Sequence, residues 1–311
     1  MFLLAIDFGN TTLKAALFEN EVLLKVRYSL SIIHLDNWID EIRNSKQLEG
    51  IIISSVRKNE ETEFSFIESL KKKIVSSTRN NFDNSKLIIK SNSESKKFAT
   101  DSKGSSVVVV LDETTPLPIQ NNYLTPKTLG KDRLAAVIGA YFLEKETIKQ
   151  PTLVIDAGTC ITFDFINTKS KIKGVYEGGS ISLGLQMRFK ALNHFTAKLP
   201  LFEPNETLPT PIGASTQEAM QSGVQFGLIS EIKGIIDFYQ HQITLNNKGT
   251  NTKLNIVVCG GDAQILKKWW EEYVINFTTN SHIYPKWTIE PNLVLIGLQR
   301  IFQFIKNNED N

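Results

Sequence analysis

The chain has 311 residues, of which 41% are hydrophobic and 22% are charged, and its formal net charge is +2. This composition excludes a disordered chain, the length favours two domains, and the small net charge argues against a dedicated nucleic-acid partner. The sequence has no apolar run of membrane-spanning length and no signal-peptide pattern at its N-terminus. Since two cysteines are too few for a disulfide framework, we expect a cytoplasmic protein without a membrane partner.

The first half of the chain opens with an apolar run that is interrupted by a turn signal and then resumes. Residues 3–14 therefore predict a buried strand, a tight turn and a second strand. The polar segment 91–105 is rich in serine and lysine and is expected to be a mobile surface loop. The remaining segments predict, in chain order, a strand over 21–29, a helix over 36–49, a buried parallel strand over 50–56, an amphipathic helix over 61–75, strands over 87–90 and 107–111, and a helix from 132 to about 145.

The second half of the chain repeats this organisation. The strand–turn–strand pattern returns over 152–166, and its Asp156 follows Asp7 by close to half a chain length. We therefore predict two α/β domains of similar build, residues 1–130 and 131–311. The later segments predict a helix over 215–239 with a break near 223–227, a strand over 254–259, a tight turn over 260–263 that leads into a helix, and a final helix that opens at 292–298.

Both hairpins carry residue types that suit a phosphate. The glycine that follows each aspartate lets the backbone come close to a ligand and expose its N–H groups. The alternative for a single copy is a structural β-turn, because Asp, Asn and Gly all favour turns. The repetition after half a chain favours the phosphate interpretation. Two such hairpins facing each other across a cleft could hold a polyphosphate and its metal ion.

Asp132 and Arg133 lie between the hairpins, directly before a predicted helix. Asp132 could cap that helix, or it could take a proton from a substrate hydroxyl that attacks a γ-phosphate. Arg133 could hold a carboxylate or phosphate through its planar guanidinium, or form a salt bridge that pins the first helical turn. The turn over 260–263 could likewise receive a nucleotide base or ribose, or be only a tight connection.

A series of motifs runs along the chain: Asp7-x-Gly9-Asn10-Thr11-x-x-Lys14, Tyr123, Gly130-x-Asp132-Arg133, Asp156-Ala157-Gly158-Thr159, Gly178-Gly179-x-Ile181-x-x-Gly184, Ser215-Thr216-x-x-Ala219-x-x-Ser222-Gly223 and Leu293-Val294-Leu295-x-Gly297-Leu298. In this order, the motifs resemble those of type III pantothenate kinases, from about residue 3 to residue 298. The departures from the family pattern are few: Cys160 and Leu183 stand where alanine and proline are expected, Leu134 stands where tryptophan is usual, and the loop over 91–105 is long.

The resemblance implies a fold and a reaction. The family belongs to the acetate and sugar kinase/heat-shock chaperone/actin superfamily, so the implied fold is α/β, with two similar ribonuclease H-like domains (a duplicated actin-like ATPase fold) and an interdomain cleft. The implied reaction is the ATP-dependent phosphorylation of pantothenate to 4′-phosphopantothenate, the first step towards coenzyme A. The resemblance also implies a homodimer, Mg²⁺, and a monovalent cation such as K⁺ or NH₄⁺.

By motif matching, the resemblance also implies roles for individual residues. Asp132 would be the general base, Asp156 would bind K⁺, and Asp7 would position Mg²⁺ through water. The implied ATP-binding residues are Asp7, Phe8, Gly9, Asn10, Thr11, Thr12, Leu13, Lys14 and Thr159. The implied pantothenate-binding residues are Tyr123, Gly130, Lys131, Asp132, Arg133 and Thr216.

Three other functions stay open at this point. Another small-molecule kinase of the superfamily, such as a sugar or acetate kinase, would need the same phosphoryl-transfer parts. An accessory regulator of transcription would be expected to lack a catalytic carboxylate or to carry a basic surface, yet Asp7, Asp132 and Asp156 are all present. A chaperone-like or actin-like ATPase would need inserted subdomains, for which the chain has no room.

Overall fold

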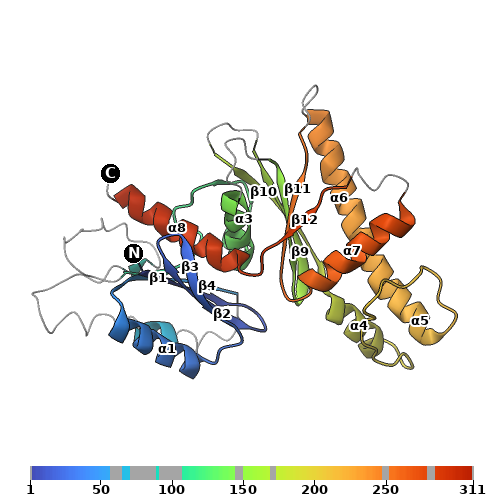
Figure 1. The fold of residues 1–311 in the computed structure, drawn as a ribbon, viewed down its shortest axis with the longest axis horizontal. Coiled ribbons are helices and arrows are strands. Elements are labelled where there is room, and N and C mark those ends of the chain that lie inside the picture. The colour runs from blue at the N-terminus through green and yellow to red at the C-terminus, as the bar shows by residue number, and fades with distance from the viewer. Residues whose placement is uncertain are drawn as a thin grey trace, which may run out of the picture. The chain divides into compact units, whose positions relative to one another are not determined.

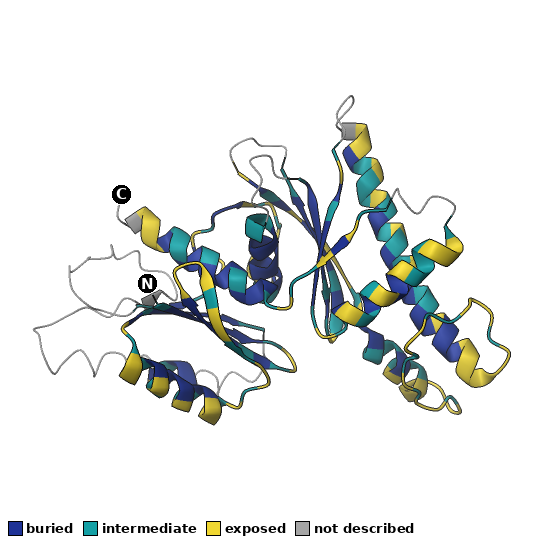
Figure 2. Ribbon diagram, viewed as in Figure 1, coloured by how far each residue is buried: buried dark blue, intermediate teal, exposed yellow. Residues whose placement is uncertain are grey.

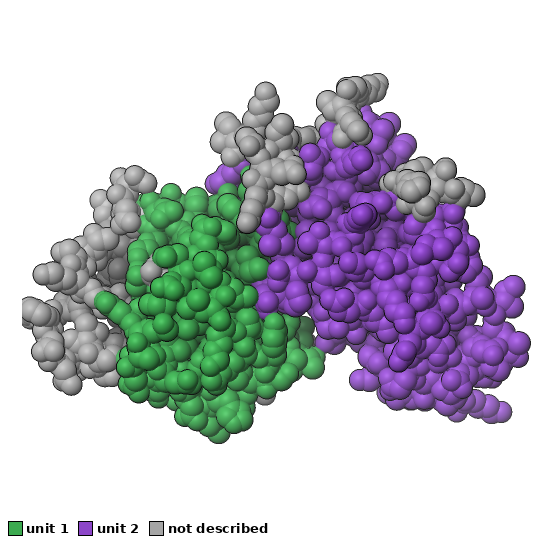
Figure 3. Space-filling model, in the orientation of Figure 1, with its two compact units in different colours: residues 1–118, 124–142, 294–311 green, residues 119–123, 143–293 purple. Residues whose placement is uncertain are grey.

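The structure is a computed structural model that describes residues 2–56, 65–70, 89–90, 107–143, 150–168, 173–246, 252–278 and 284–309 (Figure 1). The predicted loop over 91–105 and most of the predicted helix over 61–75 lie outside the described residues, although residues 65–70 are helical. Contacts between Cα atoms divide the chain into two compact units (Figure 3). Unit 1 comprises residues 1–118, 124–142 and 294–311, and unit 2 comprises residues 119–123 and 143–293.

Unit 1 contains a six-stranded mixed sheet. Its strands are β1 (Phe2–Phe8), β2 (Leu13–Glu19), β3 (Val22–Arg27), β4 (Leu48–Ser55), β5 (Ile89–Lys90) and β6 (Val107–Val110). Their order in space is β3-β2-β1-β4-β6-β5. Strand β2 is antiparallel to both β1 and β3, whereas β1, β4, β6 and β5 pair in parallel. The predicted first hairpin and the predicted parallel strand over 50–56 are therefore confirmed.

Helices cover both faces of this sheet (Figure 1). Helix α1 (Ile32–Ser45) buries Leu35, Trp38 and Ile39 in the same core as the alternate β4 residues. It begins four residues before the predicted start, because Ser31 accepts a hydrogen bond from the His34 backbone N–H at 3.2 Å and caps the helix there. The sequence pattern missed this cap.

The other face of the sheet receives helices from distant parts of the chain. Helix α8 (Leu293–Glu309) comes so close to β4 that a Cβ on Gly50 would lie 2.1 Å from Cζ of Phe302. It also touches α3 (Lys131–Leu143), where a Cβ on Gly297 would lie 1.8 Å from the Ala135 carbonyl oxygen. Both helices follow residue 130 in sequence, yet their contacts place residues 131–142 and 294–311 in unit 1.

Unit 2 contains a second six-stranded sheet in which the same strand order recurs. Its strands are β7 (Gln120–Asn121), β8 (Thr152–Ala157), β9 (Cys160–Asn167), β10 (Val175–Leu183), β11 (Asn255–Cys259) and β12 (Trp287–Ile289). The order β10-β9-β8-β11-β12 repeats the order β3-β2-β1-β4-β6 of unit 1, and β7 is added beside β10. The duplicated ribonuclease H-like build is confirmed. Strands β7, β10 and β12 were not predicted.

Helices α4 (Leu185–His194), α6 (Gly227–Asn246) and α7 (Ala263–Phe277) pack on this sheet around one hydrophobic core that includes Phe189, Ile232 and Trp269. Unit 2 also contains the short helix α5 (Thr216–Gln221). Figure 2 shows the buried residues of each unit gathered in the strands and on the inner sides of the helices. Among the described residues, no helix is both long enough and apolar enough to cross a membrane.

The interruption predicted near residues 223–227 is found in the regular α-helix, but helical hydrogen bonding is not broken there. This stretch is the π-helical turn η1 (Ser222–Phe226), which joins α5 to α6. The Gly227 backbone N–H donates to the Ser222 carbonyl oxygen five residues earlier, so hydrogen bonding continues through the glycines. Glycine weakens a helix, but a wider turn still satisfies the backbone and no break is needed.

Candidate active site

The first predicted phosphate hairpin places its carboxylate at the buried end of β1. Asp7 is 4% exposed and lies beside Lys14 of β2 and Ser54 of β4 in the sheet. The Ser54 hydroxyl donates a hydrogen bond of 2.6 Å to Oδ1 of Asp7. This short hydrogen bond holds the carboxyl group of Asp7 in one orientation.

The turn beyond Asp7 closes on itself and presents its tip to solvent. The Gly9 backbone N–H donates to the Thr12 carbonyl oxygen at 3.1 Å, while Asn10 and Thr11 are exposed. A Cβ on Gly9 would lie 3.0 Å from that same oxygen. The glycine therefore avoids a tight contact in this turn, and the exposed tip can be approached by a ligand.

Asp132 lies inside the first turn of α3, which begins at Lys131, so it is not the cap residue. Its Oδ1 accepts the Arg133 backbone N–H at 2.8 Å, which satisfies a donor that a helix start leaves open. A Cβ on Gly130 would lie 2.6 Å from the same Oδ1, so the glycine leaves room for the carboxylate. Asp132 remains half-buried, whereas Arg133 is only 6% exposed.

Lys131 points back along the chain from the same turn. Its Nζ donates to the Pro126 carbonyl oxygen at 3.0 Å. Burial lowers the pKa of Lys131, and the nearby carboxylates of Glu113 and Asp112 partly offset this effect.

The second predicted hairpin, in unit 2, repeats the first with a shorter turn. Asp156 stands at the end of β8, with Thr162 of β9 and Cys259 of β11 as its sheet neighbours. The Gly158 backbone N–H donates to the Cys160 carbonyl oxygen at 3.0 Å, and Thr159 is exposed at the tip. Asp156 thus occupies in unit 2 the position that Asp7 occupies in unit 1.

The turn between β11 and α7 packs directly against this hairpin. Gly260 has a φ of +93°, and a Cβ there would lie 2.6 Å from Oδ1 of Asp156 and 2.3 Å from the Ala157 carbonyl oxygen. The Asp262 backbone N–H donates to that carbonyl at 3.0 Å. Burial raises the pKa of the Asp262 carboxyl. The glycine-rich turn is therefore a tight connection that packs against the Asp156 carboxylate.

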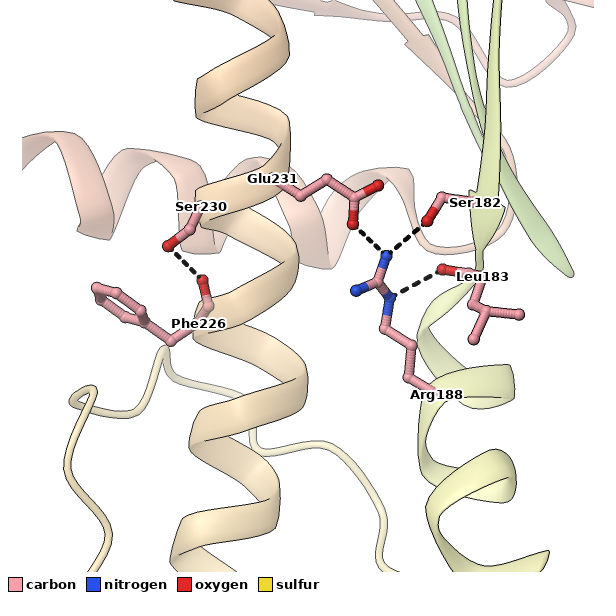
Figure 4. A network of polar contacts seen from close by, with 6 residues as sticks. All are labelled: Ser182, Leu183, Arg188, Phe226, Ser230 and Glu231. Carbon is pink, nitrogen blue, oxygen red and sulfur yellow. Dashed lines mark hydrogen bonds and ion pairs between the residues drawn. The ribbon is translucent and has the colours of Figure 1, made fainter. Parts of the chain in front are cut away.

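A second glycine, Gly184 between β10 and α4, approaches the same hairpin. A Cβ on Gly184 would lie 2.3 Å from the carbonyl oxygens of both Gly158 and Thr159. Leu183 directly precedes Gly184, and its carbonyl oxygen accepts a hydrogen bond of 2.9 Å from the Arg188 guanidinium (Figure 4).

Arg188 is tied to its surroundings by two further contacts. It donates to Oγ of Ser182 at 3.1 Å and forms an ion pair with Glu231 of α6 (Figure 4). It therefore anchors the end of β10 beside the second turn. Arg188 is not among the predicted site residues, although it lies four residues after Gly184, the last residue of one of the motifs.

Tyr123 and Thr216 also belong to unit 2. Tyr123 is half-buried two residues after the end of β7, and its backbone N–H donates to Oδ1 of Asn121 at 3.0 Å. Thr216 is exposed at the first position of α5, where Ser215 caps the helix by accepting from the Glu218 N–H at 3.2 Å. The other predicted residues of unit 2 are Asp156 and Thr159, while residues 7–14 and 130–133 all lie in unit 1.

Each hairpin offers oxygen atoms of the kind that bind Mg²⁺ or K⁺. The part of the chain that the structure describes holds no group of three or more His, Cys, Asp and Glu side chains suited to a metal. A cation near Asp7 or Asp156 would therefore need further oxygens from backbone carbonyls, hydroxyls, water or a bound phosphate. The donor set fits hard cations that share a site with a polyphosphate.

A family model and the sequences of known proteins match this chain over most of its length. A family model described as type III pantothenate kinase matches residues 3–237. A type III pantothenate kinase of Cytophaga hutchinsonii is 33% identical over 301 residues, which cover 97% of this chain and 98% of that protein. One from Christiangramia forsetii is 36% identical over 263 residues, which cover 85% and 87%.

One solved structure shows the same fold over nearly the whole chain. It is a conserved protein of Campylobacter jejuni described as belonging to a Baf family of transcriptional activators. The TM-score is 0.50 at 18% identity, with 98% of this chain and 99% of that chain covered. At this identity the likeness is one of fold alone.

Proposed function

The chain belongs to the type III pantothenate kinase family and is therefore a kinase, and we propose that it transfers the γ-phosphoryl group of ATP to pantothenate. The products are ADP and 4′-phosphopantothenate. The observation that carries this proposal is the family match over residues 3–237, within which the motif carboxylates Asp7, Asp132 and Asp156 are all present.

We propose that Asp132 is the general base. The pantothenate hydroxyl oxygen attacks the γ-phosphorus, its proton passes to the Asp132 carboxylate, and the bond to the β-phosphate oxygen breaks. Support comes from the half-buried position of Asp132 and from the space that Gly130 leaves beside its Oδ1. Lys131, Arg133, Tyr123 and Thr216 would bind pantothenate together with the Gly130 backbone.

The first hairpin would bind the phosphates of ATP. Its exposed turn offers backbone N–H groups and hydroxyls, and Lys14 adds a positive charge beside Asp7 in the sheet. The residues assigned to ATP in unit 1 are Asp7, Phe8, Gly9, Asn10, Thr11, Thr12, Leu13 and Lys14. Thr159 of the second hairpin would complete the set.

Two cations would assist the reaction. Asp7 would hold Mg²⁺ through water, and Asp156 would bind K⁺ or NH₄⁺ with nearby backbone carbonyls. The support is the carboxylate, hydroxyl and carbonyl oxygens that both hairpins offer and the close packing of Gly184 and Gly260 around the second one. When bound, the cations would neutralise charge on the phosphates of ATP.

We further propose a cytoplasmic homodimer. The cysteines Cys160 and Cys259 are both free, which supports a reducing compartment. Ile181 is 60% exposed and Leu183 is 44% exposed. Because they are two residues apart in β10, their side chains lie on the same face of the strand. Exposed apolar side chains on one face support a protein contact. We propose that neither a nucleic acid nor a membrane is a partner.

The decisive experiment is an ADP-release assay with purified protein, ATP, Mg²⁺ and K⁺. We expect turnover that requires pantothenate and is not supported by acetate or by hexoses. Faster turnover with a sugar or acetate would favour another small-molecule kinase. ATP hydrolysis without any acceptor would favour an ATPase switch. The absence of turnover with every acceptor, together with specific DNA binding, would favour the transcriptional role.

A further inference from the structure

A buried polar cluster in unit 2 has no role in the reaction described so far. Asp164 of β9 is 1% exposed and Tyr176 of β10 is 0% exposed. The Tyr176 hydroxyl donates to Oδ1 of Asp164 at 2.6 Å, and Oγ1 of Thr162 donates to Oδ2 at 3.0 Å. A buried carboxylate is costly unless it is hydrogen-bonded, and an apolar pair would fill the same space at less cost. A polar exception to the core pattern calls for a functional explanation.

The cluster connects the core of unit 2 to Tyr123, a proposed pantothenate-binding residue. The ring of Tyr176 stacks on the ring of Tyr123, with centroids 6.1 Å apart and planes 4° apart. Tyr123 is only half-buried, so the fully buried ring supports one that ligands can reach. Stacked aromatic pairs contribute beyond their buried area and have a defined geometry.

The backbone of β10 next to the stacked rings leaves space for the side chain of Tyr123. The register of β10 against β9 shifts between Tyr176 and Gly178, an irregularity of the kind that re-aims side chains near active sites. Gly178 has a φ of +106°, and a Cβ there would lie 3.5 Å from Cδ2 of Tyr123. The Tyr123 ring therefore lies against both Tyr176 and the Gly178 backbone.

Hydrogen bonds tie the chain next to Tyr123 to the same strand. The Asn122 backbone N–H donates to the Tyr176 carbonyl oxygen at 3.0 Å, and Nδ2 of Asn122 donates to the Glu177 carboxylate at 3.0 Å. Consequently β10 contacts both the backbone of this segment and the ring of Tyr123.

We propose that Asp164 and Tyr176 are positioning residues for substrate recognition: their hydrogen bond holds the Tyr176 ring, which in turn orients Tyr123 towards pantothenate. This inference rests on the proposed role of Tyr123 in binding that substrate. Neither positioning residue touches the reacting atoms. They act through the stack and set the affinity for pantothenate, not for ATP.

The test is a double-mutant cycle on steady-state kinetics. We expect Tyr176→Phe to raise KM for pantothenate by roughly 3- to 10-fold, the range that one hydrogen bond covers, with KM for ATP unchanged. In a Tyr123→Ala background, Tyr176→Phe should have no further effect on pantothenate KM, because the residue through which it acts is absent. Additive effects, or an unchanged pantothenate KM in Tyr176→Phe, would overturn the proposal.

Two further variants separate positioning from general stability. Asp164→Asn keeps an oxygen that can accept from Tyr176 and should stay near the wild-type KM, whereas Asp164→Ala should match Tyr176→Phe. Tyr239→Phe is the matched control: burial raises the pKa of Tyr239 and the Asp164 charge adds to the shift, but its ring stacks on Phe165 and not on Tyr123. A similar rise in pantothenate KM for Tyr239→Phe would contradict the proposal.

A structural readout keeps this inference separate from the proposed function. If the wild-type protein shows no pantothenate-dependent turnover, the proposed function fails. The orientation of the Tyr123 ring can still be compared between crystal structures of the wild type and Tyr176→Phe. We expect the stack to be lost or reoriented in the variant. An unchanged Tyr123 ring would overturn the positioning role whatever the substrate is.

Discussion

Gly260 faces the Asp156 carboxylate so closely that a Cβ at position 260 would lie 2.6 Å from Oδ1. The φ of Gly260 is +93°, a conformation that other residues rarely adopt. The residue is therefore required twice, for its backbone conformation and for the space in front of Asp156. This contact joins two parts of unit 2 that are about a hundred residues apart in sequence.

Gly260→Ala should lower both the melting temperature and the activation by K⁺. The added methyl group displaces the Asp156 carboxylate, and the strained φ costs about 1 kcal/mol in addition. Thermal unfolding and a K⁺ titration of turnover measure the two effects. Gly261→Ala is the control, because a Cβ at Gly261 meets nothing within 4 Å. An unchanged K⁺ response in a folded Gly260→Ala protein would separate this turn from the cation site.

Asp132→Asn should fold normally and lose roughly 10²- to 10⁴-fold in kcat, the usual effect of removing a general base. Asparagine keeps an oxygen that can accept the Arg133 backbone N–H, so the helix start is preserved. Steady-state kinetics and the melting temperature test this together. Near-normal kcat in the folded variant would leave Asp132 with only a structural role at the start of α3.

Arg188→Ala should raise KM for ATP and lower the melting temperature. The substitution removes the donors to Leu183 and Ser182 and leaves Glu231 without this partner, which frees the end of β10 beside the second turn. Breaking a partly buried pair of this kind costs about 1–3 kcal/mol. Lys267→Ala is the matched control, because Lys267 and Glu271 form an ion pair at 4.0 Å that is more exposed. Equal effects of the two variants on KM would refute the anchoring role.

Asp262→Asn should stabilise the protein at neutral pH and lose that advantage in acid. Burial raises the pKa of Asp262 above its ordinary value of 3.8, so the folded state holds the proton more tightly than the unfolded chain. The free energy of unfolding therefore falls as the pH rises through the pKa of Asp262 in the folded state, and the full loss of stability is reached above that pKa. Melting temperatures of both proteins between pH 3 and pH 7 should converge at the acid end. A difference that does not depend on pH would show that burial of the charge is not the cause.

Short-range patterns in the sequence were sufficient for the elements that carry the phosphate hairpins. An apolar run followed by a glycine turn specifies β1 with β2 and β8 with β9, because the signal lies within about fifteen residues. The same patterns failed for β10, in which most residues after Tyr176 are exposed and two glycines interrupt the strand. Strand β7 is two residues long and shows no periodicity.

The sequence by itself also determined which chemical groups are available, since the carboxylates and glycines stand at fixed positions in the motifs. Only the tertiary structure decided what surrounds them. Gly297 meets Ala135 and Gly260 meets Asp156 across long stretches of chain, and the Tyr176 hydroxyl reaches Asp164 inside the sheet. Close approaches of this kind depend on how whole elements pack, because close-packed interiors place each side chain by its neighbours in space and not by its neighbours in sequence.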